Sequence, residues 1–341
     1  MTGGSAIPVE NLAEYLSGRL GETATVKAAT VASEGASDDT WMLEVETPGG
    51  AQDLVVRRYR PGGAVREETD PERHFRILRE LGGEQVPAPE ALWFEPGPEV
   101  AGGPFFVMRR AHGRIVVPWL AEGRAFLAAA GDGPLGERFV AILAAIHGVR
   151  WRGGGLEFLA DADPGRPQED AARRVARMRS MLERYRCEPE PILLDALAWL
   201  DRNLPEQERT TLVHGDYRTG NVVFGERDIN AVLDWEFARI GDPASDLAWV
   251  LSPSNSMGSD LACYLLPPER VLEIYEREAG WLPSAESLRF WDLLHLVFNA
   301  VLWISAEHNY RSGATTDIGL ARWSYTVPRL RGMVLDALEQ R

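Results

Sequence analysis

Cysteine and lysine are scarce in this chain. Its 341 residues include two cysteines, Cys187 and Cys263, whose spacing does not suggest a metal site. Two cysteines cannot form a disulfide framework, so bridges of this kind do not hold the protein together. Lys27 is the single lysine, and arginine therefore supplies nearly all of the other positive charges. A site that needs a cationic side chain is expected to use arginine.

Targeting and membrane segments are also missing from the sequence. The first residues, MTGGSAIPVENLAEYL, lack the basic head and apolar run of a signal peptide. No uninterrupted apolar segment approaches the roughly 18 residues that a transmembrane helix needs. We therefore expect a cytoplasmic protein that does not insert into a membrane.

Two common catalytic motifs are absent. The chain has no G-x-x-x-x-G-K-[ST] sequence, which excludes a P-loop kinase on motif grounds. It also has no G-x-S-x-G sequence, which removes the commonest type of hydrolase. Internal repeats, coiled-coil heptads and low-complexity tracts are likewise not found.

Negative charge is in excess. The formal net charge of −15 argues against non-specific binding to nucleic acid. An acidic surface either attracts cationic substrates or serves only solubility, and the sequence leaves both interpretations open. At this length the chain exceeds one average domain, so two lobes or domains are expected.

The stretch from Thr211 to Val250 holds the main candidate site. Asp216 and Asn221 are separated by four residues, and Asp234 follows after a short insert. Val222–Phe224 is expected to form a strand and Ala231–Leu233 a returning strand that delivers Asp234. The stretch therefore brings a carboxylate, an amide and a second carboxylate toward one another.

The string HGDYRTGN…VLDWEFARIGDPASDLAWV resembles the aminoglycoside phosphotransferase and choline kinase-like family. It is most similar to the branch whose members are joined to acyl-CoA dehydrogenases in some animal proteins. The resemblance implies an α+β, bilobal protein-kinase-like fold. Residues 1–109 would form a small antiparallel-sheet, nucleotide-binding lobe, and residues 110–341 a large, mainly helical catalytic and substrate-binding lobe. The implied enzyme is a phosphotransferase with an alcohol group as acceptor.

The resemblance also implies roles for residues of this stretch. Asp216 would orient the acceptor hydroxyl and accept its proton, while Asn221 and Asp234 would hold Mg²⁺ against the phosphates of ATP or GTP. Arg218 would stabilise charge near the γ-phosphate. Glu236 either assists the metal through a water molecule or caps the following turn.

Neighbouring residues of the stretch are interpreted as structural. His214 is expected to brace the loop backbone. Asp242 and Asp246 are also assigned structural roles, and Asp246 is expected to cap the helix that follows it. If Asp246 also bonds the catalytic loop, its replacement would cost activity through geometry.

The resemblance places nucleotide contacts in the N-terminal lobe. Gly35, Ala36 and Ser37 match a glycine-rich turn that covers the phosphates, with Asp38 in place of the family's asparagine; the alternative is an ordinary hairpin loop. Arg57 occupies the strand position where the family carries a phosphate-binding lysine. Arginine can bind phosphate in a bidentate manner, so the role can survive the exchange, unless Arg57 is a solvated strand residue.

Two further features of this lobe are a departure from the family pattern at His74 and an expected hinge at Val107–Arg110. His74 stands where the family has a glutamate that pairs with the strand cation, and Glu72 and Glu68 lie nearby. A hinge at Val107–Arg110, which includes Met108 and Arg110, would meet the adenine edge. That contact uses main-chain groups, so side chains cannot test it.

The helical pattern of the C-terminal lobe leaves the acceptor open. His295 and Asn299 either face a substrate pocket or form a hydrogen-bonded core pair, and Trp291, Phe298 and Trp303 would favour an apolar acceptor if they lined that pocket. Aminoglycosides, macrolides, choline-like alcohols, sugars and hydroxyacyl compounds all remain possible acceptors. A nucleotide-binding protein with little transferase activity and a kinase of protein substrates are the alternatives. The expected partner is a small-molecule hydroxyl acceptor, and the oligomeric state is not indicated.

Helices are expected at 9–20, 71–81, 135–147, 168–186, 190–203, 268–279 and 287–306.

Overall fold

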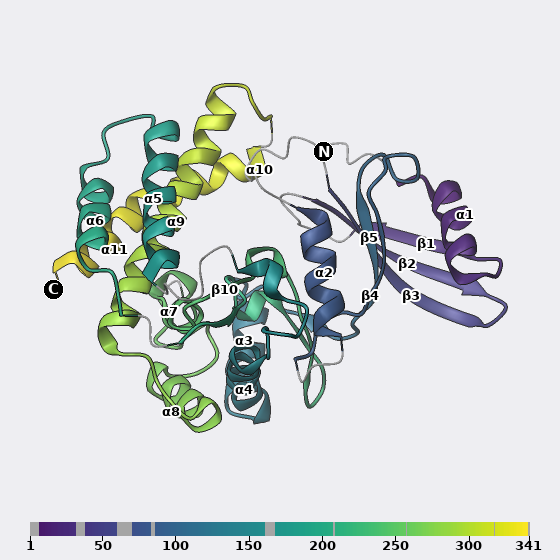
Figure 1. Ribbon diagram of the computed structural model, residues 1–341, viewed down its shortest axis with the longest axis horizontal. Helices are drawn as coiled ribbons and strands as arrows, with labels where there is room; N and C mark the ends of the chain where they lie inside the picture. The colour runs from purple at the N-terminus through teal and green to yellow at the C-terminus, as the bar shows by residue number, and fades with distance from the viewer. Residues whose placement is uncertain are drawn as a thin grey trace. The chain divides into compact units, whose positions relative to one another are not determined.

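The chain folds into two compact units, which Figure 1 draws as a computed structural model. The first unit comprises Met1–Gly82 and Ala88–Ala111, and the second comprises Gly83–Pro87 and His112–Arg341. The first unit therefore ends two residues beyond the lobe boundary expected from the sequence. The structure describes residues 7–31, 38–59, 70–82, 86–160, 168–206, 209–256, 258–316 and 318–339.

The first unit is built on a five-stranded antiparallel sheet with the strand order β1-β2-β3-β5-β4. Long β-branched and aromatic runs separated by glycine-containing turns favour such a sheet. The expected sheet and both expected helices are confirmed. The elements are α1 (Val9–Leu20), β1 (Thr25–Val31), β2 (Asp38–Thr47), β3 (Gly50–Tyr59), α2 (Pro71–Leu81), β4 (Ala91–Glu95) and β5 (Phe105–Arg109).

Alternate residues of β3 face opposite sides of the sheet. Leu54 and Val56 belong to the core that α1 covers, whereas Tyr59 reaches α2 through a hydrogen bond between its hydroxyl and Nδ1 of His74 at 2.7 Å. Arg58 lies on the same side as Leu54 and is buried. Its guanidinium is paired with Asp39 and donates to a backbone carbonyl, so the charge is compensated inside the core. Alternation places Arg57 on the opposite side, with Tyr59.

Helix α2 begins as its sequence predicts. Asp70 is the N-cap, and its carboxylate accepts a hydrogen bond from the backbone N–H of Arg73 at 3.0 Å. Pro71 occupies the first turn, where its missing N–H costs no helical hydrogen bond. The cap fixes where the helix starts.

The second unit is organised around α9 (Ala285–Arg311). Its buried side chains share one core cluster with residues from four other helices. Among the described residues it is the one helix long and apolar enough to cross a membrane by length and composition, and here it is the core helix of this unit. It extends past both ends of the segment expected from the sequence. The other helices of eight or more residues are α3 (Ala121–Gly131), α4 (Pro134–Gly148), α5 (Gln168–Tyr185), α6 (Pro191–Arg202), α7 (Ala244–Leu251), α8 (Pro268–Ala279) and α11 (Val327–Glu339).

Short strands carry the segment that holds the candidate site. Strands β6, β8 and β9 form one antiparallel sheet, and β7 pairs with β10 in a second. The hairpin expected between residues 222 and 233 is present as β8 and β9. The bounds are β6 (Arg114–Ile115), β7 (Thr211–Val213), β8 (Val222–Phe224), β9 (Ile229–Val232) and β10 (Arg239–Gly241).

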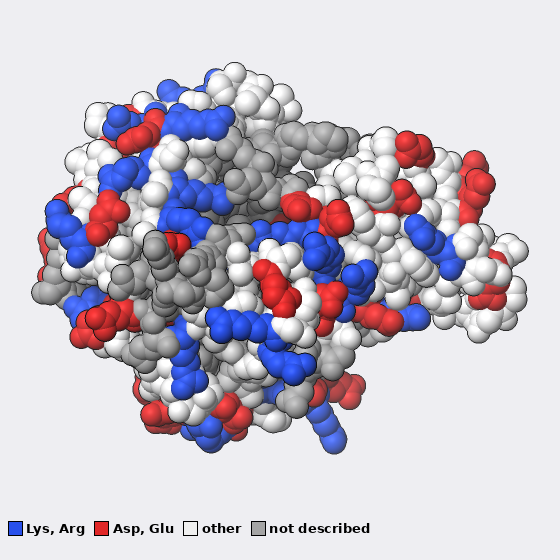
Figure 2. Space-filling model, viewed as in Figure 1, with Lys and Arg blue, Asp and Glu red and all other residues white. Residues whose placement is uncertain are grey.

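Both signs of charge are interspersed over the face drawn in Figure 2. Several of the arginines on the described surface are paired with carboxylates, for example Arg138 with Asp228 at 2.7 Å and Arg109 with Glu90 at 2.7 Å. On this face, the net negative charge is therefore not gathered into one acidic area.

Candidate active site

The carboxylate of Asp216 lies in the loop between β7 and β8 and is held by three side chains. Oδ1 accepts a hydrogen bond from Nε of Arg218 at 3.2 Å and one from the indole Nε1 of Trp249 at 2.9 Å. Oδ2 accepts from Nδ2 of Asn221 at 2.8 Å, and the same amide nitrogen donates to the Asp216 carbonyl at 2.9 Å. The proposed base is thus fixed in orientation before any ligand binds.

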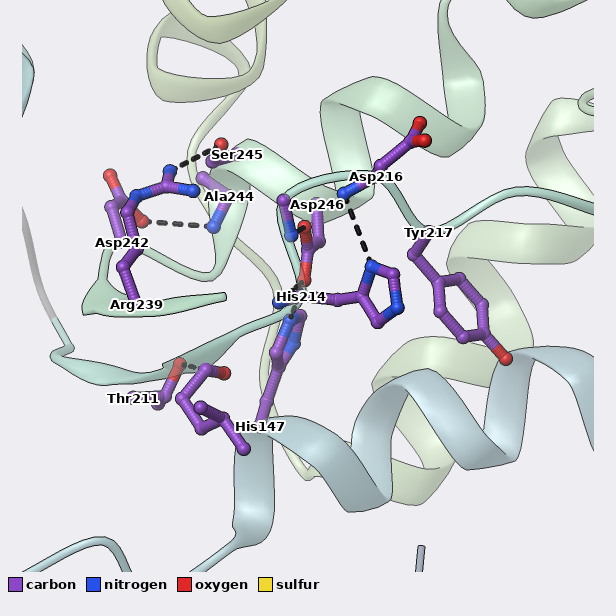
Figure 3. A network of polar contacts seen from close by, with 12 residues as sticks. His147, Thr211, His214, Asp216, Tyr217, Arg239, Asp242, Ala244, Ser245 and Asp246 are labelled. Carbon is purple, nitrogen blue, oxygen red and sulfur yellow. Dashed lines mark hydrogen bonds and ion pairs between the residues drawn. The ribbon is translucent and has the colours of Figure 1, made fainter. Parts of the chain in front are cut away.

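His214 braces the loop, as expected from the sequence. Its side chain is buried, and Nε2 donates to the carbonyl of Leu233 at 2.9 Å. Nδ1 accepts from the backbone N–H of Asp216 at 3.2 Å (Figure 3). These bonds require the neutral tautomer with its proton on Nε2. Burial lowers the pKa of His214 more than the neighbouring carboxylates raise it, so the ring stays neutral near pH 7.

Asp246 anchors the start of the loop from α7. Its Oδ2 accepts from the backbone N–H of His214 at 2.7 Å and from Nε2 of His147 at 3.3 Å, while Oδ1 accepts from the N–H of Gly215 at 2.8 Å (Figure 3). Burial alone raises the pKa of Asp246, but the hydrogen bond and charge of His147, with the charges of His214 and Arg239, bring it down to about 2. The carboxylate is therefore ionised inside the protein.

The expected capping role of Asp246 is wrong. Helix α7 begins at Ala244, so Asp246 lies within its first turn and not before it. Its carboxylate satisfies two N–H groups of the catalytic loop instead. The condition stated from the sequence, that Asp246 also bonds this loop, is met.

Gly215 is required by the path of the loop. Its φ is +85°, and a Cβ atom at this position would lie 2.6 Å from the carbonyl oxygen of Phe237. The next residues are anchored as well, because the buried Tyr217 donates its hydroxyl to the carbonyl of Phe139 at 2.7 Å. The loop therefore has no room to shift toward either neighbour.

Asp234 has an unusual backbone conformation, with φ +60° and ψ +52°. A non-glycine residue in the left-handed region stores strain that is often found at functional sites. The adjacent Leu233 donates its N–H to the carbonyl of Asn221 at 2.8 Å, which ties the two candidate metal ligands together. Glu236 follows in a short 3₁₀ turn, Trp235–Phe237, and is partly exposed.

The donor chemistry of this segment fits a magnesium ion. Because Nδ2 of Asn221 is committed to Asp216, its amide oxygen is the group left for a cation. Asp234 adds a carboxylate, and Mg²⁺ prefers oxygen ligands from one or two carboxylates together with substrate phosphates and water. In the described ranges, no group of three or more His, Cys, Asp or Glu residues could hold a metal unaided. The arrangement therefore suits an ion that arrives with a phosphorylated ligand.

Of the candidate nucleotide residues in the first unit, the structure describes Arg57, Met108 and Arg110. Gly35, Ala36 and Ser37 lie outside the described residues. The Arg57 guanidinium lies over the Tyr59 ring at 5.9 Å, and Tyr59 bonds His74. His74, which stands where the family has its glutamate, is buried and contacts this tyrosine hydroxyl.

The expected hinge lies at the end of β5. Met108 pairs in register with Val55 of β3, and the N–H groups of Arg109 and Arg110 donate to the carbonyls of Glu90 and Asp53 at 2.9 and 3.0 Å. These two N–H groups are therefore already paired. An adenine edge could not use them without displacing a sheet bond.

A buried polar network supports the segment between β10 and α7. Arg239 donates to Asp170 at 3.2 Å and to Ser245 Oγ at 2.8 Å, and Ser245 contacts Nε2 of His295 at 3.3 Å (Figure 3 draws Arg239 and Ser245). Asn299 donates to the hydroxyl of Ser254 at 3.4 Å. His295 and Asn299 thus bond to different serines, and the expected pair between them is not formed.

Asp242 completes the turn before α7. Its Oδ1 accepts from the N–H of Ala244 at 2.9 Å, and Oδ2 accepts from the indole Nε1 of Trp291 at 2.8 Å. Burial raises the pKa of Asp242, and the bond from Trp291 opposes this shift. The structural role expected for Asp242 is confirmed by these contacts.

Sequence reasoning did not find Trp249. Its indole reaches Asp216 because α7 places it beside the loop. A helix was expected after Asp246, but no role was assigned to Trp249. Helical spacing aligns Trp249 with Asp246, three residues earlier on the same face, and this is the signal that could have found it.

The fold and the loop define a protein-kinase-like phosphotransferase, and the comparisons with known proteins agree. The sequence profile of the "Phosphotransferase enzyme family" matches residues 28–291. The chain belongs to this family. The expected family and fold class are confirmed.

Relatives in animals carry a similar segment within much longer chains. Acyl-CoA dehydrogenase family member 10 of Mus musculus is 30% identical over 254 residues, which cover 72% of this chain and 22% of the mouse protein. Acyl-CoA dehydrogenase family member 11 of Rattus norvegicus is 27% identical over 292 residues, which cover 82% of this chain and 36% of the rat protein. The chain thus spans about a third or less of the length of these relatives.

Solved structures share the fold. A protein of Ralstonia eutropha assigned to the aminoglycoside phosphotransferases is 22% identical, with a TM-score of 0.72 over 98% of this chain and 99% of its own. Macrolide 2'-phosphotransferase type I is 20% identical, with a TM-score of 0.61 over 95% of this chain and 97% of its own. At these identities the likeness establishes the fold alone.

Proposed function

We propose that this protein transfers the γ-phosphoryl group of ATP or GTP to a hydroxyl group of a small molecule. The observation that carries the proposal is the arrangement of Asp216, Asn221 and Asp234. A carboxylate, an amide and a second carboxylate are tied together by hydrogen bonds through the Asp216–Asn221 contact and the Leu233 backbone. Phosphoryl transfer depends mainly on such placement and on neutralising charge.

In this proposal each residue of the loop has a defined task. Asp216 orients the acceptor hydroxyl and takes its proton as the oxygen bonds to phosphorus and the bond to the nucleoside diphosphate breaks. Asn221 and Asp234 hold Mg²⁺, with Glu236 either assisting through water or capping its turn. Bound Mg²⁺ would neutralise phosphate charge. Arg218, whose side chain is 31% exposed, is free enough to turn from Asp216 toward a phosphate.

The first unit supplies the remaining nucleotide contacts in the proposal. Gly35, Ala36 and Ser37 cover the phosphates, and Arg57 grips them in place of the family's lysine. Met108 and Arg110 flank the adenine, where carbonyl groups are the available partners because the Arg110 N–H is paired with Asp53. Solved relatives of the fold include a streptomycin–ATP–APH(2")-IIa ternary complex, which supports ATP as donor.

The acceptor is proposed only as a class. Related structures carry gentamicin, and hygromycin B with ADP, which favours hydroxylated small molecules. The sequence relatives are acyl-CoA dehydrogenase family members, which adds hydroxyacyl thioesters to the candidates. We propose a cytoplasmic enzyme that acts on one of these groups.

The test is nucleotide turnover with Mg²⁺ across aminoglycosides, macrolides, sugars, amino alcohols and hydroxyacyl thioesters. Asp216→Asn and Asp234→Ala are expected to abolish acceptor-dependent release of nucleoside diphosphate. Asp228→Asn is the matched control, because Asp228 lies in the β8–β9 turn of the same segment and its side chain is 59% exposed. Turnover that survives in Asp216→Asn would contradict the proposal. Tight nucleotide binding without turnover would favour a nucleotide-binding protein with little transferase activity, the second candidate, which Arg57 and the missing helix glutamate suggest.

A further inference from the structure

The indole of Trp249 is buried and contacts Asp216, the proposed base. It lies in α7 and is 8% exposed, and its Nε1–H donates to Oδ1 of Asp216 at 2.9 Å. The ring packs edge-on against His295 with centroids 5.0 Å apart. Its carbonyl accepts from Nδ2 of Asn255 at 2.7 Å and from the N–H of Ser252 at 3.3 Å. The indole is therefore fixed on several sides and has little freedom to leave Asp216.

The hydrogen bonds of Asp216 differ between its two oxygens. Oδ1 accepts from Trp249 and from Arg218, whereas among the described residues Asn221 alone donates to Oδ2. A carboxylate has about four lone-pair sites, roughly two on each oxygen. The two donors therefore fill Oδ1, and Oδ2 keeps one site for a further donor.

We infer that Trp249 is a positioning residue that holds Oδ1 of Asp216, so that Oδ2 receives the proton of the acceptor hydroxyl. This inference rests on the proposed function. In the transfer step the acceptor O–H donates its proton to Oδ2 while its oxygen bonds to the γ-phosphorus. The electron pair of the breaking phosphorus–oxygen bond leaves with the nucleoside diphosphate.

Trp249 and Arg218 differ in how firmly each can hold Oδ1 of Asp216. The guanidinium of Arg218 is partly exposed and is the group proposed to meet the γ-phosphate. When it turns away, Trp249 is the donor that still holds Oδ1. Rotation about the last bond of an aspartate is soft, so without this donor the carboxylate could turn. A misplacement of about 1 Å can cost roughly 100-fold in rate.

Trp249→Phe tests the role, with Trp291→Phe as the matched control. Both substitutions keep an aromatic ring and remove one indole N–H that donates to a buried aspartate group, at 2.9 and 2.8 Å respectively. Trp291 bonds Asp242, which lies outside the proposed chemistry. We expect kcat of Trp249→Phe to fall about 10- to 100-fold with the nucleotide KM within twofold, and kcat of folded Trp291→Phe to stay within threefold. A Trp249→Phe enzyme with kcat within threefold of wild type overturns the inference, as does an equal loss in both variants.

A second measurement does not depend on turnover. In spectra of ¹⁵N-labelled protein, the indole cross-peak of Trp249 is identified by its loss in Trp249→Phe. Asp216→Asn is expected to move this peak and to leave the Trp291 peak in place. An unmoved Trp249 peak overturns the contact, whatever the activity. A wild type that turns over no nucleotide overturns the proposed function and with it the proton assignment, but not the contact reported by the peak.

Discussion

Replacement of Asp246 by asparagine is the most informative perturbation of the loop between β7 and β8. Both carboxylate oxygens accept from backbone N–H groups, Oδ2 from His214 and Oδ1 from Gly215. An asparagine side chain has one oxygen and one NH₂ group. In either rotamer the NH₂ therefore faces a buried N–H donor, which is left without an acceptor. The size of the side chain is unchanged, so the variant tests hydrogen bonding and charge with little effect on packing.

Two contributions set the magnitude. The folded pKa of Asp246 is about 2 against an ordinary 3.8, and roughly 1.8 pKa units correspond to about 2 kcal/mol of stability. A buried N–H without a partner costs a further ~1–3 kcal/mol. The two overlap in part, so we expect a loss of about 3 kcal/mol in the free energy of unfolding. Because the pKa is depressed, the charge contribution is complete above about pH 5 and is lost as the pH falls toward 2.

The assay is urea unfolding of wild type and Asp246→Asn at pH 7.5 and pH 5.5. Both values lie above the window in which the carboxyl titrates, so the difference should be the same at each. Asp228→Asn is the control, since this exposed aspartate also accepts from a backbone N–H, that of Ile229 at 2.7 Å. It should change stability by less than ~1 kcal/mol. A loss for Asp246→Asn no larger than that of Asp228→Asn would refute the reasoning.

Two more predictions concern Asp292 and Gly215 of the second unit. Burial raises the pKa of Asp292 to about 6, against a hydrogen bond from Ser252, so stability is lost as the pH rises from 3.8 through 6. Asp292→Asn should therefore raise the free energy of unfolding by up to about 3 kcal/mol at pH 7.5 and by little at pH 4. Urea titrations without any gain at pH 7.5 would contradict this. Gly215→Ala should unfold at a much lower temperature and lose nucleotide turnover, because its Cβ would lie 2.6 Å from a backbone oxygen. Gly21 has φ +71° and open space around it, so Gly21→Ala should cost only about 1–2 kcal/mol of stability. Equal melting temperatures for the two variants would count against the steric argument.

Local patterns carried most of the fold prediction. The helix expected at 71–81 is α2, and the strand runs Val222–Phe224 and Ala231–Leu233 predicted the hairpin of β8 and β9. These features depend on neighbours in sequence, which is why they can be read without a structure. Helix α8 (Pro268–Ala279) matches the expected helix at both ends, and a proline in its first turn and a glycine at its C-cap mark these ends locally.

Contacts between distant segments were not predictable in the same way. Asp246 was expected to cap α7, yet its carboxylate reaches back over 31 and 32 residues to Gly215 and His214. A capping aspartate and a loop-bracing aspartate have the same local sequence. Trp249 was missed because its partner, Asp216, is 33 residues away. Only the fold decides between such alternatives.

Leu233 explains why the candidate site behaves as one unit. Its carbonyl accepts from Nε2 of His214, and its N–H donates to the carbonyl of Asn221. Nδ1 of His214 accepts from the backbone N–H of Asp216, and the backbone N–H of His214 donates to Asp246. The backbone beside Asp234 is thus bonded to the segment that carries the other proposed ligand and the proposed base. Substitutions in this network should therefore not be additive, because breaking one bond releases groups that the others hold in place.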